Sequence, residues 1–185
     1  RLKEHFNESL PIIRDKNLSL ILEGGMDENE LKRKIDYFGL KLKGSCYVAA
    51  AANIDNDRKE GGIFTSNDTE LMRFAVINIA KEIMDKYSVG EVLIYHNELV
   101  FIFGFEGYSN KDVCRNEAIF RNVYSILEEI RLNVEKFLKL TVTIGVGNII
   151  NCTDKIRESY KSALSALEYK LVIGESRIIF IGDLE

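Results

Sequence analysis

The sequence predicts an α/β (α+β) fold, in which a mixed central sheet is flanked by helices and preceded by an N-terminal helical extension. Short apolar segments typical of buried strands alternate with longer segments whose apolar residues recur at helical spacing. Beyond the extension the order is strand, helix, strand, strand, helix, strand, helix, strand. This order requires crossover connections with helices laid against a sheet. It predicts a ferredoxin-like palm with an added helix and strand.

The helical extension is expected to cover residues 1–43. Its first helix, residues 2–22, has apolar residues at helical spacing but contains Pro11, where the helix is either kinked or restarted with Ser9 as its cap. A second, short helix is expected over residues 27–38, where acidic residues precede basic ones. The extension is interpreted either as a packing arm or as a connector helix that contributes to a dimer seam.

The first strand of the main domain is predicted over residues 46–55, CYVAAAANID, where the alanines suggest a closely packed helix. After a loop, Asn67 and Glu70 resemble a capping box that opens a helix over residues 68–87. This helix is apolar around much of its circumference, so it is expected to be well buried. Its apolar residues include Leu71, Phe74, Ala75, Ile79 and Ile83.

A hairpin is predicted over residues 92–105, VLIYHNELVFIFGF. Its two apolar segments contain no polar alternation, so both faces of each strand are expected to be covered. Between them lie only Tyr95, His96, Asn97 and Glu98. Four residues with Asn at a turn position suit a tight hairpin, because Asn tolerates positive φ better than most residues. We expect functional side chains at this polar tip.

A long helix is predicted over residues 111–138. It carries an apolar stripe that would cover one face of the sheet, although a dimer seam would show the same spacing. The stripe consists of Val113, Phe120, Val123, Leu127, Ile130, Val134 and Phe137.

Two further strands and a helix close the chain. An alternating strand over residues 140–147, LTVTIGVG, ends at glycines that would let a helix pass close by. Asn151 or Thr153 is expected to cap the next helix, and Gly174 to end it. The final strand is predicted over residues 177–181, RIIFI.

Composition and charge narrow the possible functions. A hydrophobic content of 46% in 185 residues is that of a globular chain with a substantial core. The formal net charge of −4 argues against this segment binding nucleic acid by itself, since such binding draws on several unbalanced cations. The three cysteines lack disulfide or zinc spacing, so reduced thiols and a cytoplasmic location are expected. No apolar stretch approaches the roughly 20 residues that span a bilayer.

Common catalytic signatures are missing from the sequence. It contains no Walker loop, no GxSxG and no HExxH. Gly145 and Gly147 are only a fragment of a dinucleotide fingerprint. Of the two histidines, His96 lies on the hairpin tip, where it either contacts a ligand or is an inert exposed side chain. In a palm sheet the hairpin pairs next to the first strand, so residues 53–55, NID, are expected beside this tip.

Four segments of the chain together resemble a GGDEF-type domain. They are NID at 53–55, YHNEL at 95–99, TVTIGVG at 141–147 and SYKSALSALEYKLVIGESRIIF at 159–180. The resemblance covers nearly all of residues 47–184 and implies a GGDEF/nucleotide-cyclase-like palm.

The resemblance is closest to one subgroup, which also shares the segments FAVINIAKEI and LKLTVTIGVGN. This subgroup is the central degenerate GGDEF-like domain of AraC-family two-component response regulators from Gram-positive bacteria, here expected at residues 44–185. In that architecture the domain lies between an N-terminal receiver and a C-terminal pair of helix-turn-helix motifs. The start at Arg1 and the end at Glu185 fit a segment excised from such a longer protein.

The resemblance also implies roles for the residues of the tip and the first strand. Active family members condense two GTP molecules into a cyclic dinucleotide with the help of divalent metal ions. Asn53 and Asn97 stand where these members carry metal-binding carboxylates, and an amide brings no charge to such a site. The two tip glycines, which let backbone approach the nucleotide, correspond to Tyr95 and His96, whose side chains would occupy that space.

Two acids remain where family members carry them, Asp55 and Glu98. The Arg-x-x-Asp pair of the family's product-inhibition site is not found in residues 86–90. From these departures the domain is expected not to be an enzyme, and to use neither metal nor cofactor.

The favoured function is a non-catalytic relay and dimerisation domain that links a receiver to a DNA-binding region. The alternative is an allosteric sensor whose degenerate cleft binds a nucleotide or another small ligand, and an active diguanylate cyclase is the least favoured hypothesis. A second copy of the chain and the neighbouring domains are the expected partners, without DNA or membrane contact by this segment. The candidate ligand residues are Asn53, Asp55, Tyr95, His96, Asn97 and Glu98.

Overall fold

A mixed five-stranded sheet forms the centre of the computed structural model, which describes residues 1–55, 66–106 and 113–184. The strand order is β2-β3-β1-β4-β5, and only β4 and β5 pair in parallel. The strands are β1 (Cys46–Ile54), β2 (Gly90–Tyr95), β3 (Glu98–Phe105), β4 (Val142–Val146) and β5 (Ile178–Phe180). The predicted mixed sheet and its order of elements are therefore confirmed.

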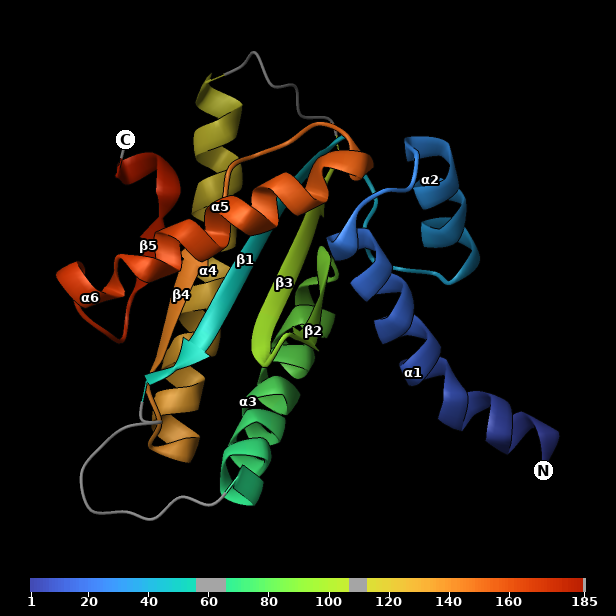
Figure 1. The fold of residues 1–185 in the computed structure, drawn as a ribbon, viewed down its shortest axis with the longest axis horizontal. Coiled ribbons are helices and arrows are strands. Elements are labelled where there is room, and N and C mark those ends of the chain that lie inside the picture. The colour runs from blue at the N-terminus through green and yellow to red at the C-terminus, as the bar shows by residue number, and fades with distance from the viewer. Residues whose placement is uncertain (56–65, 107–112, 185) are drawn as a thin grey trace.

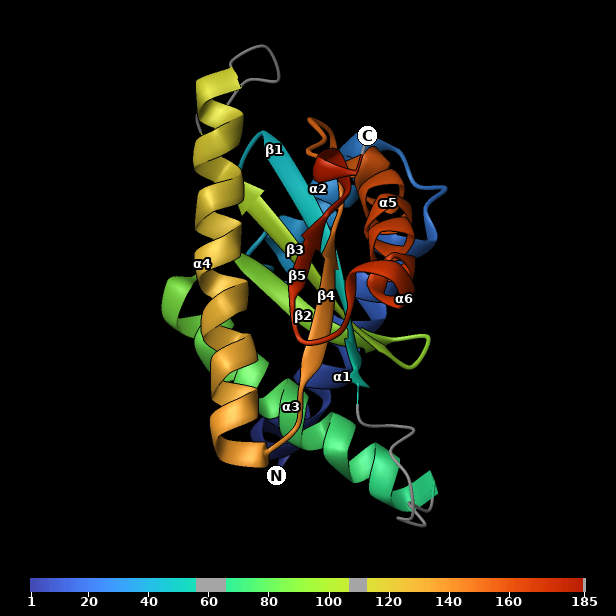
Figure 2. The same ribbon diagram turned by 90° about the vertical axis from the view of Figure 1, so that its left-hand side faces the viewer.

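Helices cover both faces of this sheet (Figures 1 and 2). One face packs against α3 (Ser66–Tyr87) and α4 (Val113–Leu138), and the other against α1 (Leu2–Glu23) and α5 (Ile156–Glu168). The short helix α2 (Glu28–Tyr37) joins the second layer. The described residues also form the helix α6 (Lys170–Ile173) and the 3-10 turns η2 (Thr153–Lys155) and η3 (Ile181–Asp183).

Small residues of the central strands let α5 lie unusually close to the sheet. A Cβ at Gly145 would lie 2.3 Å from the carbonyl oxygen of Ala163, and one at Gly147 would lie 2.0 Å from that of Ser159. The amide of Ala49 donates a hydrogen bond of 2.8 Å to Ser159 Oγ, which in turn donates to a loop carbonyl. The predicted passage of a helix over these glycines is confirmed.

The hairpin between β2 and β3 turns over two residues. Tyr95 pairs with Glu98, and the residues between them, His96 and Asn97, have φ values of 49° and 65°. Two positive φ angles in a two-residue loop match the twist of the flanking strands. The expected tight turn with Asn in a left-handed conformation is confirmed.

Two predicted helix caps were wrong, and so was the restart of the first helix at Ser9. That helix is a single α1 that runs through Pro11. The surrounding residues are exposed, so the carbonyl that loses its partner at a proline is free to be solvated. Asn67 lies inside α3, which begins at Ser66. Neither Asn151 nor Thr153 caps α5, because the 3-10 turn η2 comes first and the N-cap is Lys155, without a side-chain bond.

Some apolar side chains that were expected to be buried are exposed. Leu71 and Phe74 in the first turns of α3 have exposed fractions of 67% and 59%, and Phe137 in the last turn of α4 has 64%. These helix ends extend past the edge of the sheet, where no strand covers them (Figure 1). The middle of the predicted α4 stripe is buried as expected, at Val123, Leu127, Ile130 and Val134. The side chain of Val113 lies outside the described residues.

None of the helices in the described part of the chain combines the length and the apolarity that crossing a bilayer requires.

We expect Gly145→Ala to destabilise the domain because the new Cβ would clash with Ala163 O and with Leu167 N at 2.7 Å. Overpacking of this kind costs about 1–3 kcal/mol of unfolding free energy, which urea denaturation measures. Gly182→Ala is the matched control, since nothing lies within 4 Å of its Cβ position. Equal stabilities of the two variants would contradict the close approach of α5.

Candidate functional site

A cleft of about 640 Å³ opens where β1 ends beside the β2–β3 turn. This volume falls within the range of small-molecule sites. The start of α3 and the segment that joins α5 to β5 complete its walls. Its lining consists of Ala52, Asn53, Ile54, Asp55, Thr69, Arg73, Asn97, Glu98, Leu99, Leu164, Leu167, Glu168, Lys170, Leu171 and Glu175. Four of the six predicted ligand residues are therefore brought together here.

The other two predicted residues, Tyr95 and His96, do not line the cleft. The two rings stack on each other with centroids 4.1 Å apart, and Tyr95 meets Tyr160 of α5 edge-on at 5.6 Å. His96 is exposed on the turn. Tyr95 therefore packs toward α5 and not into the cleft.

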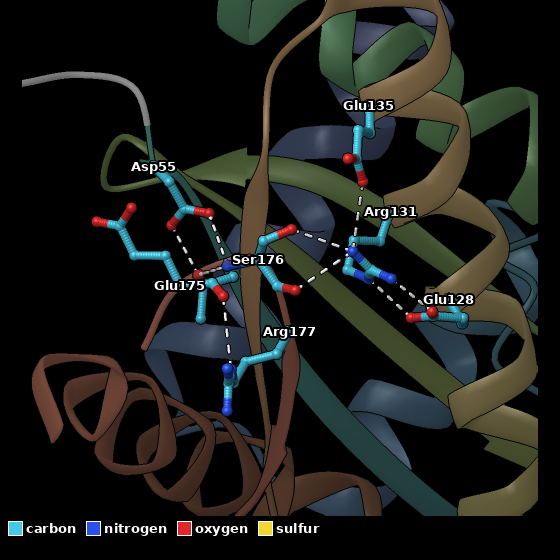
Figure 3. A network of polar contacts seen from close by, with 8 residues as sticks. Asp55, Glu128, Arg131, Glu135, Glu175, Ser176 and Arg177 are labelled. Atoms are coloured by element: carbon cyan, nitrogen blue, oxygen red, sulfur yellow. Dashed lines mark hydrogen bonds and ion pairs between the residues drawn. The ribbon is translucent and has the colours of Figure 1, made fainter. Parts of the chain in front are cut away.

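Asp55 is buried and fully engaged in bonds within the protein (Figure 3). Its Oδ1 accepts a hydrogen bond of 2.7 Å from Thr143 Oγ1, and its Oδ2 accepts one of 3.1 Å from the amide of Ser176. Lys170 Nζ lies 4.0 Å from Oδ1. A carboxylate with this set of partners holds the segment before β5 against β4, so it is a structural group at the wall of the cleft.

Glu98 differs from Asp55 because one of its carboxylate oxygens has no hydrogen bond within the described residues. Its Oε2 atom is buried and has no hydrogen-bond partner among the described residues. Loss of solvent raises the pKa of this carboxyl, while the charges of His96 and Lys170 act in the opposite direction. An unpaired buried carboxylate oxygen is costly, so the site favours a ligand that supplies a donor or a cation.

The amides Asn53 and Asn97 flank Glu98 in the cleft. Each can both donate and accept hydrogen bonds, which suits an uncharged polar ligand group as well as a cation. Within residues 1–55, 66–106 and 113–184, no cluster of three or more His, Cys, Asp or Glu side chains is arranged to hold a metal ion. A hard cation would thus depend on Glu98 together with amide oxygens.

Sequence reasoning missed several charged residues of the cleft. Arg73 comes from α3, whereas Glu168, Lys170 and Glu175 come from the end of α5 and the segment after it. These residues lie far from the hairpin in the sequence, and no spacing pattern links them to it. The packing of α5 across the sheet brings Glu168, Lys170 and Glu175 to the tip.

The raised pKa of Glu98 predicts a pH dependence of stability. A raised pKa means that the folded state binds this proton more readily than the unfolded state, so the unfolding free energy falls as the pH rises from 4.5 through the raised pKa. Glu98→Gln removes this group and should lose less stability over the same range. Urea denaturation at a series of pH values measures the difference, and superimposable profiles would contradict a desolvated Glu98.

Two solved structures share this fold. The active GGEEF domain of a diguanylate cyclase from Vibrio cholerae has a TM-score of 0.50 and 13% identity, over 81% of this chain and 88% of that one. The diguanylate cyclase SiaD from Pseudomonas aeruginosa, solved with its activator SiaC, has a TM-score of 0.58 and 13% identity. The match covers 97% of this chain and 70% of that one. At 13% identity, this similarity establishes the fold alone.

These neighbours correct the prediction that the chain is not an enzyme. Both are diguanylate cyclases, and one is described as an active domain. The chain therefore has the fold of a cyclase, and the amides at Asn53 and Asn97 do not by themselves establish inactivity.

The sequence comparisons give the family directly. No curated protein matched the chain. A family model described as "GGDEF-like domain" matches residues 23–169, which is most of the chain and includes most of the cleft lining and the elements from α2 to α5. The chain belongs to the GGDEF-like domain family.

Proposed function

We propose that this GGDEF-like domain relays a signal through α1 and helps to hold two copies of a longer regulator together. The observation that carries the proposal is the unequal fixing of α1. Its C-terminal half is buried on the sheet, with Leu18, Ile21 and Leu22 in the core, whereas its N-terminal half is exposed and points away from the domain (Figure 1). A helix fixed at one end transmits a displacement of its other end.

A buried carboxylate on the edge strand β2 fixes α1 in place. Glu91 accepts from Arg14 Nη2 of α1 and from the amide of Lys41, each at 2.9 Å. The same Arg14 nitrogen lies 3.3 Å from the carbonyl oxygen of Gly39. Loss of solvent raises the pKa of Glu91, and its two bonds oppose that shift. The helix and the segment after α2 therefore meet at one charged point.

A second contact fixes the end of α1 to α5. The Arg157 guanidinium donates to the carbonyl of Glu23, the last residue of α1. Gly24 follows with a φ of 77°, and a Cβ there would lie 3.0 Å from the Arg157 side chain. Movement of α1 would therefore be transmitted to α5, whose far end lines the cleft.

The free half of α1 offers apolar side chains for contact with a second copy. Leu2 and Ile12 have exposed fractions of 89% and 72%. An exposed helix that carries apolar side chains is suited to a helical seam. The family match begins at residue 23, so this helix precedes the part of the chain shared with the family.

The wider context is also a proposal. We place the domain in an AraC-family two-component response regulator of a Gram-positive bacterium, in the cytoplasm, between a receiver and a helix-turn-helix region. Residues 1–43 would form the connector and residues 44–185 the GGDEF-like domain proper. The sequence resemblance supports this placement, and the net charge of −4 is consistent with DNA contacts made elsewhere.

Sedimentation of the 185-residue chain tests the dimer. We expect a concentration-dependent dimer whose dissociation constant rises at least about tenfold in Ile12→Glu, because a charge would enter the apolar seam. Asn7→Glu adds the same charge at an exposed polar position five residues before Ile12, on another side of the helix, and is the control. A wild-type chain that stays monomeric up to high micromolar concentration would refute the proposed seam.

The cleft supports a second candidate function, a sensor for a nucleotide or another small ligand. The unpaired Oε2 atom of Glu98, set in a cleft of about 640 Å³, is the specific observation in its favour. The two functions are compatible, since a ligand in the cleft would contact the end of α5.

GTP with Mg²⁺ is the probe for this second function. We expect a saturable rise in melting temperature that Asn97→Ala abolishes and the exposed, distant Asn148→Ala retains. Chromatography of the same samples for a cyclic product separates binding from turnover. A flat response of the wild-type chain to the nucleotide would rule out this ligand.

A further inference from the structure

Three parts of the fold meet at Ser176, in the segment between α6 and β5 (Figure 3). We propose that Ser176 is a junction that couples the cleft to helix α4, so that a change in the bonds on one side alters the bonds on the other. The coupling rests on the proposed relay function for its biological role. The contacts that carry it are independent of that function.

On the cleft side, the amide of Ser176 is shared between two acceptors. It donates to Asp55 Oδ2 at 3.1 Å and to Thr143 Oγ1 at 3.0 Å. Asp55 and the preceding residue Glu175 both line the cleft. A ligand that attracts either acid, or that displaces Lys170 from its place 4.0 Å from Asp55, would therefore change the bonds of this amide.

On the other side, Ser176 is held by a cation of α4. Arg131 Nη1 donates to the Ser176 carbonyl at 3.2 Å and to its hydroxyl at 3.1 Å. Two acids of the same helix orient the guanidinium, Glu128 at 2.6 Å and 2.8 Å and Glu135 at 3.6 Å. Ser176 thus donates to a carboxylate through its amide and accepts from a guanidinium through its carbonyl.

The backbone of Ser176 explains why this contact responds to its surroundings. Its φ of 57° lies in the left-handed region that residues with a Cβ rarely adopt. Such a conformation persists where neighbouring bonds hold it. Release of the bonds on one side would let the backbone relax and would withdraw the acceptors on the other side. This relaxed conformation is the second arrangement that the proposed coupling between distant sites requires.

On α4, the junction residue Arg131 lies beside exposed apolar side chains. Leu132 follows Arg131 directly and is half exposed, as is Tyr124 about two turns earlier. A shift of the guanidinium would therefore act beside apolar side chains that face solvent. A simple staple between helix and strand would show the same bonds, and its loss would loosen Ser176 alone. Coupling also carries an effect from α4 to Asp55, and from Asp55 to α4.

Amide exchange and NMR of the 185-residue chain distinguish coupling from a simple staple. In Arg131→Gln we expect the Ser176 amide to exchange at least about tenfold faster, and the Asp55 amide to shift, although Arg131 bonds to neither. In Asp55→Asn we expect the Arg131 Nε–H resonance to move. Arg121→Gln, an exposed position of the same helix, is the control and should leave the Ser176 and Asp55 amides unchanged.

An Asp55 amide that is unchanged in Arg131→Gln, or an Arg131 Nε–H resonance that is unchanged in Asp55→Asn, would overturn the coupling. If Arg131→Gln does not fold, Arg131→Lys keeps the charge beside Glu128 and Glu135 and is judged by the same readout. A monomeric wild-type chain would leave this result untouched, and a failed coupling would leave the dimer untouched, so the two proposals fail separately.

Discussion

The close contact of α5 with the central strands determines where the other functional parts lie. Gly145 and Gly147 leave no room for a Cβ between β4 and α5, and Ser159 is bonded directly to the backbone of β1. The helix is therefore held at a fixed height over the sheet. Its C-terminal end brings Lys170 and the segment up to Ser176 beside the end of β1. The cleft and the junction with α4 both follow from this contact.

The hairpin tip was predictable because its geometry is local, since Asn97 suits a left-handed turn wherever the rest of the chain lies. The role of Asp55 was not, because its partners Thr143 and Ser176 are 88 and 121 residues away in the sequence. The exposure of Phe74 was missed because it also depends on parts of the fold that are remote in the sequence. A helical pattern shows which side chains are apolar, but not where the sheet beneath them ends.

The two acids retained beside the tip illustrate how environment decides use. Asp55 and Glu98 both line the cleft, yet Asp55 is satisfied by a hydroxyl and an amide while Glu98 keeps an unpaired oxygen. Residue type alone would have treated them as a pair of ligands. Of the two, Glu98 has an oxygen that no internal bond uses, so we expect a ligand in the cleft to depend on Glu98 more than on Asp55.

Buried carboxylates tie helices to the sheet on both sides of it. Glu91 on β2 accepts from α1 and from the segment after α2, and Asp55 after β1 accepts from the segment that α4 also holds. Apolar contacts tolerate small slides, because dispersion and burial change little over a fraction of an ångström. Hydrogen bonds to a desolvated carboxylate depend on direction, and their loss leaves a buried charge unpaired. A displaced helix must therefore keep its bonds and move the strand, or break them. That property suits a domain built to transmit movement.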